Sequence, residues 1–104
     1  MNQRERNTLD PEEYNMGKGY DMSEIKEMPA DEAIPILDKI IELHSQEDEA
    51  YTLRGQKYWS QGKRREAIND YLQALAINPE GRAKMLLEYA NSILSYYNKD
   101  LLNP

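Results

Sequence analysis

Seven residues between positions 48 and 81 form a pattern that limits how the surrounding helices can pack. They are Tyr51, Gly55, Tyr58, Ala67, Tyr71, Ala74 and Pro79. The glycine and the alanines have almost no side chain, so helices that carry them can approach closely, and the tyrosines fill the space that remains. The proline ends a helix and turns the chain into the next segment. The pattern predicts two closely packed helices, at 48–61 and 64–77, joined by a turn at Gly62.

The spacing of these seven residues resembles that of a tetratricopeptide repeat, and residues 48–81 are similar to one complete copy. The segment from Gly62 to Ala67 resembles the turn between the two helices of such a repeat. Proteins of this family stack their helix-turn-helix units into a curved α-solenoid, whose concave face holds peptides or helices of other proteins. The resemblance therefore implies protein binding, with no catalysis and no cofactor.

A weaker copy of the pattern precedes this repeat. At the family's period of about 34 residues, the matched positions are Ala33 for Ala67, Leu37 for Tyr71 and Ile40 for Ala74. Apolar residues at helical spacing predict a helix over 31–44, with Asp31 as its N-cap. This helix resembles the second helix of a preceding repeat, so residues 22–47 are interpreted as a degenerate partial repeat.

The first helix of that partial repeat departs from the family's pattern. Its place would be near residues 14–28, where Asp21 stands for the small glycine and Glu24 for the tyrosine. The resemblance therefore does not support a regular helix over the whole stretch. We expect a short helix over residues 22–28 that stops at Pro29, because the residue before a proline disfavours helical geometry.

A further helix is predicted over 82–98, followed by an irregular tail at 99–104. Tyr89 stands where the repeat has Gly55 and cannot allow the same close crossing, so this segment resembles a terminal capping helix. The helix carries two apolar stripes, Ala83, Leu86, Ala90, Ile93 and Tyr97 on one side and Met85, Tyr89, Ser92 and Tyr96 on the other. One stripe must pack on the domain, and the second is available to a partner or a second copy of the chain. The ending at 95–100 is also similar to the tail of small stand-alone bacterial proteins of this family.

The first helix of each repeat lines the groove in this family. The resemblance assigns the groove to Glu49, Thr52, Gln56, Trp59 and Ser60, with Leu86, Ala90 and Ile93 beside them. Trp59 is a candidate anchor for a partner, because aromatic residues dominate interface energies. Alternatively, it packs under the N-terminal segment or against helix 82–98, because a tryptophan is costly to expose. The family's clamp for a C-terminal carboxylate needs asparagine where Gln56 stands and lysine where Thr52 stands, so we expect no clamp.

The net charge of −6 is distributed unevenly along the chain. Residues 1–50 carry 14 acidic and 5 basic side chains, whereas residues 51–104 carry 5 acidic and 8 basic ones. The polar composition of residues 1–21 is typical of a flexible arm, here an acidic one. Because Arg54 and Lys57 are expected at the groove's edge, we expect this arm to occupy part of the groove.

The composition excludes several classes of protein. There is no cysteine for a disulfide or a thiolate, and the one histidine, His44, is expected at a helix end. A net negative chain is a poor ligand for nucleic acid. No run approaches the roughly 20 apolar residues of a membrane span, and no apolar segment follows the N-terminus as in a secretory signal, so a cytoplasmic protein is expected. The acidic pairs at 12–13 and 31–32 fit helix N-termini better than acid–base catalysis.

These observations predict an all-α protein, an antiparallel, tetratricopeptide-like α-solenoid fragment with a C-terminal capping helix. The expected function is a protein-interaction module that binds a peptide or helix in its groove, with neither metal nor cofactor and no enzymatic activity. The alternative is a structural unit that forms a weak homodimer through helix 82–98. Lys63, Arg64 and Arg65 form a basic turn that either receives an acidic partner or is only solvated.

Overall fold

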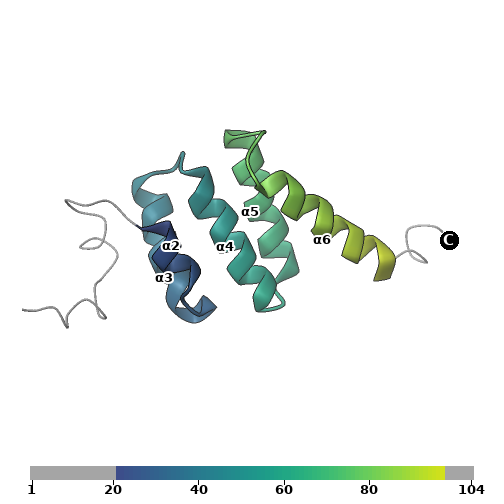
Figure 1. Ribbon diagram of the computed structural model, residues 1–104, viewed down its shortest axis with the longest axis horizontal. Helices are drawn as coiled ribbons and strands as arrows, with labels where there is room; N and C mark the ends of the chain where they lie inside the picture. The colour runs from purple at the N-terminus through teal and green to yellow at the C-terminus, as the bar shows by residue number, and fades with distance from the viewer. Residues whose placement is uncertain (1–20, 98–104) are drawn as a thin grey trace, which may run out of the picture.

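The computed structural model describes residues 21–97. Within this range the chain forms five helices: α2 (Met22–Lys26), α3 (Ala30–Leu43), α4 (Asp48–Ser60), α5 (Arg64–Ile77) and α6 (Ala83–Tyr97). Consecutive helices run antiparallel and are joined by short turns (Figure 1). The expected all-α, antiparallel fold is therefore confirmed. The predicted arm before residue 21 and tail after residue 98 lie outside the described residues.

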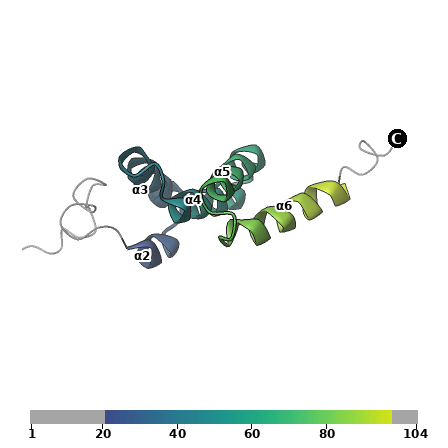
Figure 2. The same cartoon turned by 90° about the horizontal axis from the view of Figure 1, so that it is seen from above.

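Helix α4 is the centre of the arrangement, and it packs against α2, α3 and α5, while α6 packs against α5. Seen from above, α2 and α6 lie on one side of the molecule, α3 and α5 on the other, and α4 between them (Figure 2). Helix α4 is thus recessed between α2 and α6. We call this side the α2–α4–α6 face.

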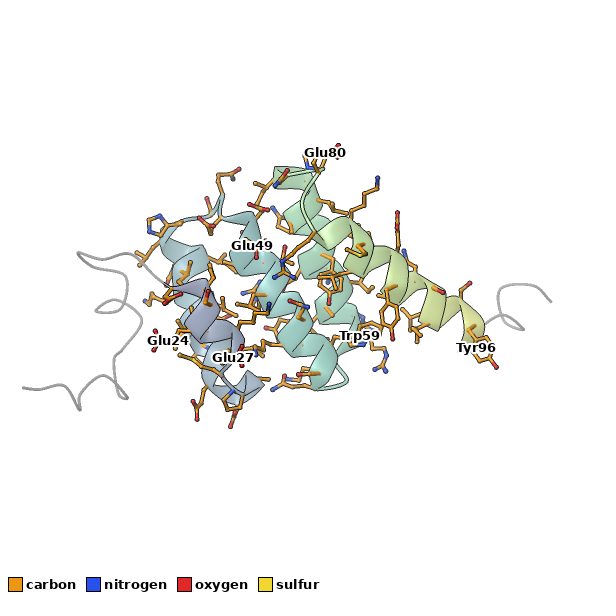
Figure 3. All side chains as sticks on the ribbon, in the orientation of Figure 1. Glu24, Glu27, Glu49, Trp59, Glu80 and Tyr96 are labelled. Atoms are coloured by element: carbon orange, nitrogen blue, oxygen red, sulfur yellow. The ribbon has the colours of Figure 1, made fainter. Side chains whose placement is uncertain are left out.

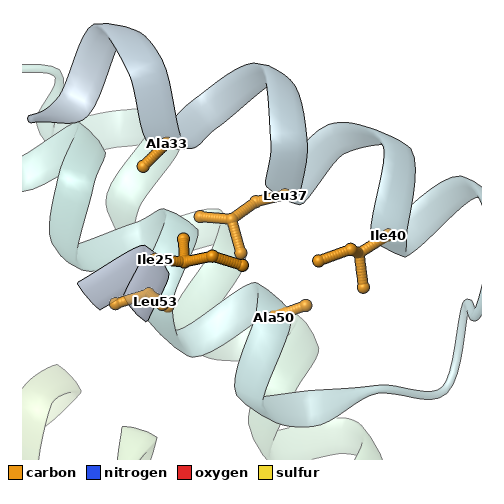
Figure 4. Close-up of a cluster of buried hydrophobic side chains, with 6 residues drawn as sticks. All are labelled: Ile25, Ala33, Leu37, Ile40, Ala50 and Leu53. Atoms are coloured by element: carbon orange, nitrogen blue, oxygen red, sulfur yellow. The ribbon is translucent and has the colours of Figure 1, made fainter. Parts of the chain in front are cut away.

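One apolar cluster joins α2, α3 and α4. Its fully or almost fully buried members are Ile25, Ala33, Leu37, Ile40, Ala50 and Leu53 (Figure 4). The two α4 residues of the cluster lie three positions apart, on one face of the helix. Because Ile25 is completely buried, the short helix α2 is held by packing, which a helix of this length needs.

A second cluster lies on the other side of α4 and joins it to α5 and α6. Its buried members are Ala67, Tyr71, Ala74, Ala83 and Ala90. Four of these five residues are alanines, so the helices approach closely. Half-buried aromatic side chains of α4, namely Tyr51, Tyr58 and Trp59, close the cluster from the side.

The closest approach between α4 and α5 lies at Gly55. A Cβ atom added there would stand 2.6 Å from Cε1 of Tyr71 and 3.2 Å from the carbonyl oxygen of Ala67. Real Cβ atoms do not tolerate the first distance, and Tyr71 is itself buried. Only glycine fits this position without a shift of the neighbouring helix.

The turn between α4 and α5 depends on a second glycine. Gly62 has a φ of +79°, in the left-handed region that other residues rarely adopt. Its N–H donates to the carbonyl of Trp59, and the N–H of Lys63 donates to the carbonyl of Tyr58. These two bonds close the C-terminus of α4, as in many glycine-ended helices. The chain therefore reverses at once into α5.

The helix boundaries lie within two residues of those predicted from the sequence, but the N-cap predicted for α3 is wrong. Helix α3 begins at Ala30, with Pro29 as its N-cap in an extended conformation, whereas the sequence predicts Asp31 as the cap. Asp31 lies instead in the first turn of α3, where a negative charge interacts favourably with the helix dipole. Proline fits here because a cap needs no hydrogen bond from its own nitrogen. The short helix before it is capped by Asp21, whose carboxylate accepts the N–H of Ser23 at 3.0 Å.

Candidate functional site on the α2–α4–α6 face

Two hollows flank α4 on the α2–α4–α6 face. The first has a volume of about 350 Å³ and lies between α4 and the end of α2; it is lined by Lys26, Met28, Pro29, Ala30, Leu53, Gln56, Lys57 and Ser60. The second has a volume of about 210 Å³ and lies between α4 and α6; it is lined by Gln56, Trp59, Tyr71, Leu86, Tyr89 and Ala90. Gln56 borders both, so the two hollows are neighbours along one face.

The hollow between α4 and α6 is built from apolar and aromatic side chains. Trp59 is half-buried, so its ring both packs against the alanine cluster and forms part of the wall (Figure 3). Tyr89 of α6 forms another part and is 60% exposed. Burial raises the pKa of the Tyr71 phenol, so this part of the lining stays uncharged at neutral pH. The hollow is therefore an apolar pocket open to solvent.

The structure brings four of the eight predicted groove residues to this hollow, and Ser60 lines the neighbouring one. The four are Gln56, Trp59, Leu86 and Ala90. Ile93 is half-buried on α6 but does not line the hollow. Thr52 is only 1% exposed, and its hydroxyl donates to the carbonyl of Asp48 at 2.9 Å. A partner therefore meets little of Thr52 on this surface.

Arg82 connects α4 to the start of α6 at one end of the α2–α4–α6 face, a role that the sequence did not indicate. Its guanidinium donates to both carboxylate oxygens of Glu49, at 3.0 and 3.2 Å, and to the amide oxygen of Gln56 at 3.2 Å. Glu49 and Gln56, two of the residues predicted for the groove, are thus tied to the start of α6. No spacing in the sequence points to this contact, because it joins residues 26 and 33 positions apart.

Arg54 is engaged within the chain, which removes one reason to expect the acidic arm in the groove; the arm itself lies outside the described residues. Its guanidinium makes two hydrogen bonds of 2.8 Å to the carboxylate of Asp70 and one of 2.8 Å to Asp38. The rings of Tyr51 and Tyr58 lie 5.8 and 5.7 Å from its central carbon. These hydrogen bonds raise the pKa of the Arg54 guanidinium above its already high ordinary value, and those to Asp70 have the largest effect. Arg54 is an internal connector of α3, α4 and α5.

Lys57 is also engaged within the chain. Its ammonium donates to the backbone carbonyls of Lys26 at 2.8 Å and Met28 at 2.6 Å. These carbonyls lie at the C-terminal end of α2, where a positive charge is favourable. Lys57 therefore fastens α2 to α4, and neither it nor Arg54 supports the expected docking of residues 1–20 in the groove.

The basic turn at the end of α4 differs from these two residues. Lys63, Arg64 and Arg65 are exposed, and none of them pairs with a carboxylate within residues 21–97. The guanidinium carbon of Arg64 lies 4.5 Å from the centre of the Trp59 ring, and the ammonium of Lys63 lies 5.9 Å from the Tyr58 ring. Arg64 thus stands beside the hollow between α4 and α6, and the other two positive charges flank it in the chain.

The two stripes of α6 lie as the sequence indicated. Ala83 and Ala90 are buried, whereas Met85, Tyr89 and Tyr96 are 66%, 60% and 69% exposed. The exposed stripe therefore continues outward from the wall of the hollow at Tyr89.

The described residues also bear on two other classes of function. Between residues 21 and 97, no three histidine, aspartate or glutamate side chains group as a metal site requires. None of the five described helices is long and apolar enough to cross a membrane.

Comparison with known protein families matches residues 48–80 to the tetratricopeptide repeat. The match covers α4, the basic turn and α5, the part of the chain that holds Gly55, the Arg54–Asp70 pair and Trp59. No curated protein and no solved structure matches the chain. Repeats of this kind are typically non-catalytic. Residues 48–80 are a tetratricopeptide repeat, and the general role this implies is protein–protein interaction.

Proposed function

We propose that the α2–α4–α6 face binds a segment of another protein, and that the hollow between α4 and α6 takes one of its apolar side chains. The observation that supports this most is the lining of that hollow, in which Trp59, Leu86 and Tyr89 present partly exposed apolar surface. A buried aromatic anchor surrounded by such contacts is typical of an interface hot spot.

The size of the hollow favours a protein side chain over a small molecule. Its volume of about 210 Å³ lies below the roughly 300–1,000 Å³ of most small-ligand pockets. The neighbouring hollow of about 350 Å³ extends the surface along α4. At their shared border, the side-chain nitrogen of Gln56 makes no hydrogen bond to another residue of 21–97 and is available to a peptide carbonyl. An extended segment can therefore lie across both hollows.

We expect changes in the hollow to weaken the binding of a peptide selected on this protein. The probe is a peptide enriched from a random display library on the immobilised full chain. Trp59→Ala and Tyr89→Lys are each expected to weaken its binding about 30-fold, because loss of an interface hot spot costs about 2 kcal/mol or more. Fluorescence polarisation measures the affinities.

Leu72→Ala is the matched control, because Leu72 is an exposed apolar residue of α5, which lies on the opposite side of the molecule (Figure 2). It should change the affinity less than twofold. Tyr89 is exposed, so Tyr89→Lys tests the hollow without removing a buried side chain. Wild-type affinity in both hollow variants would refute the proposal.

The exposed stripe of α6 supports a second candidate, self-association of two copies through this helix. Met85 and Tyr89 are two of the large apolar side chains that α6 exposes. Such a surface often belongs to an interface. Light scattering after size exclusion would then show the mass rising from 12.2 kDa toward twice that value with concentration.

Met85→Lys should hold the mass at that of the monomer, whereas Leu43→Lys, at an exposed position on α3, should leave the association unchanged. A constant monomer mass of the wild type up to millimolar protein would exclude this candidate.

A further inference from the structure

The basic turn gives the α2–α4–α6 face a charged border. Its three cations follow one another, whereas Arg54 is engaged with Asp38 and Asp70, and Lys57 with the end of α2. Within residues 21–97, Lys63, Arg64 and Arg65 have no carboxylate partner. The turn is therefore a concentration of positive charge, without a carboxylate partner among the described residues, on a chain whose net charge is −6.

The apolar hollow and this charge share a residue contact. Trp59 lines the hollow, and the guanidinium of Arg64 lies 4.5 Å from the centre of its ring. A guanidinium stacked on a ring keeps its N–H groups at its edge, where they can donate two parallel hydrogen bonds to a carboxylate. Stacking also limits the motion of the side chain, so less entropy is lost when the carboxylate binds.

We propose that the segment bound on this face is acidic: it places an apolar side chain in the hollow between α4 and α6 and one or two neighbouring carboxylates on the basic turn. This inference rests on the proposed function and specifies the chemistry of its ligand. The charges elsewhere on the molecule orient such a segment. Glu24 lies on α2 and Glu27 directly follows it, both away from Trp59 on the opposite side of α4 (Figure 3). An acidic end placed there would be repelled.

A nucleic acid is a poorer fit to the same residues. Three cations in one turn neutralise few phosphates, and the remainder of the chain is strongly acidic. The hollow also selects for an apolar side chain, which the backbone of a nucleic acid does not offer. An acidic peptide that carries an apolar side chain matches both the hollow and the basic turn.

The test uses peptides enriched from a random display library on the immobilised full chain. We expect the enriched pool to combine an aromatic or large aliphatic residue with aspartate or glutamate within a few positions. One such peptide is then synthesised together with its Glu→Gln form, which has the same shape and lacks the charge. Both are titrated by fluorescence polarisation against wild type, Arg64→Glu and Lys84→Glu.

The acidic peptide should bind Arg64→Glu about tenfold more weakly than wild type, since a hydrogen bond to a charged group contributes roughly 1.5–3 kcal/mol. The Glu→Gln form should bind wild type and Arg64→Glu alike. Lys84→Glu changes the net charge by the same amount at an exposed residue of α6 that does not line the hollow, and it should have an effect of less than twofold. Arg65→Glu serves as a second variant, one that leaves the Trp59–Arg64 stack in place.

The outcomes separate this inference from the proposed function. If peptides bind through the hollow but show no acidic enrichment, or if the Glu and Gln forms bind wild type equally, the inference is overturned and the proposed function stands. If no peptide is enriched above a blank surface, both are overturned.

Discussion

Replacing Arg54 with methionine is expected to lower the free energy of unfolding by about 3 kcal/mol, because removing one partner of a buried ion pair leaves the other charge uncompensated. The side chain of Asp70 is only 8% exposed, and that of Arg54 is 20% exposed. Methionine keeps much of the packing of the arginine stem and removes the three hydrogen bonds that connect α3, α4 and α5. Urea denaturation followed by circular dichroism measures the change.

Two further variants separate the buried pair from the exposed one. Asp38 is 53% exposed, so Asp38→Asn should cost less than about 1 kcal/mol. Arg54→Met combined with Asp70→Leu should recover most of the loss, because no unpaired charge remains in the interior. A single Arg54→Met variant as stable as wild type would show that the network does not hold the helices together.

Replacing Gly55 with valine is expected to destabilise the chain by about 3 kcal/mol, at the upper end of the usual cost of overpacking a core. The first added carbon would already stand 2.6 Å from the ring of Tyr71 and 3.2 Å from the backbone of Ala67. The ring is buried and the backbone is part of α5, so neither can move without separating the two helices. Thermal and urea denaturation measure the loss.

Gly55→Ala provides the sharper comparison. Alanine gains about 1 kcal/mol of helix propensity over glycine, which offsets part of the clash. In a Tyr71→Leu background the clash with the ring is removed, so the same Gly55→Ala change should cost at least about 1 kcal/mol less there than in the wild type. Equal costs in both backgrounds would mean that the Gly55–Tyr71 contact does not set the distance between α4 and α5.

Much of the fold could be predicted because its signals are local. Gly62 marks the end of α4, Pro29 and Pro79 mark helix boundaries, and all three act through the conformation of the backbone nearby. The close crossing at Gly55 could also be predicted from the sequence, because a helical residue without a side chain allows a neighbouring helix to approach closely.

Residues that are 34 positions apart in the two copies of the pattern also occupy equivalent places in the core. On α3, the fully buried residues are Ala33, Leu37 and Ile40. Their counterparts on α5, Ala67, Tyr71 and Ala74, are fully or almost fully buried. The pattern carries this information because burial on a helix follows its 3.6-residue period.

The polar contacts were missed because they depend on the fold. The sequence places Arg54 and Lys57 at the groove's edge, yet both are engaged by partners 16 to 31 residues away in sequence. One signal did exist for Arg54. Tyr51 and Tyr58 stand three residues before it and four after it, which places both rings on its face of the helix. A cation between two rings is commonly held in place.

The two alternatives for Trp59 meet in one arrangement. Its ring packs beside α6, as expected if Trp59 stabilises the fold. It also forms a wall of the hollow, as expected if Trp59 binds a partner. The half-buried state follows from Gly55 and the alanines around it, because small residues bring the helices close and leave the larger rings at the border. The same small residues therefore set both the helix crossing and the shape of the candidate site.

Binding of a protein segment at the hollow between α4 and α6 can be located directly by a nuclear magnetic resonance titration of the ¹⁵N-labelled full chain with a peptide enriched on it. We expect the largest amide shifts at Gln56, Trp59, Leu86 and Tyr89, with a clear shift of the Trp59 indole N–H. Shifts concentrated on α3 and around Leu72 of α5, with these four residues unchanged, would contradict it.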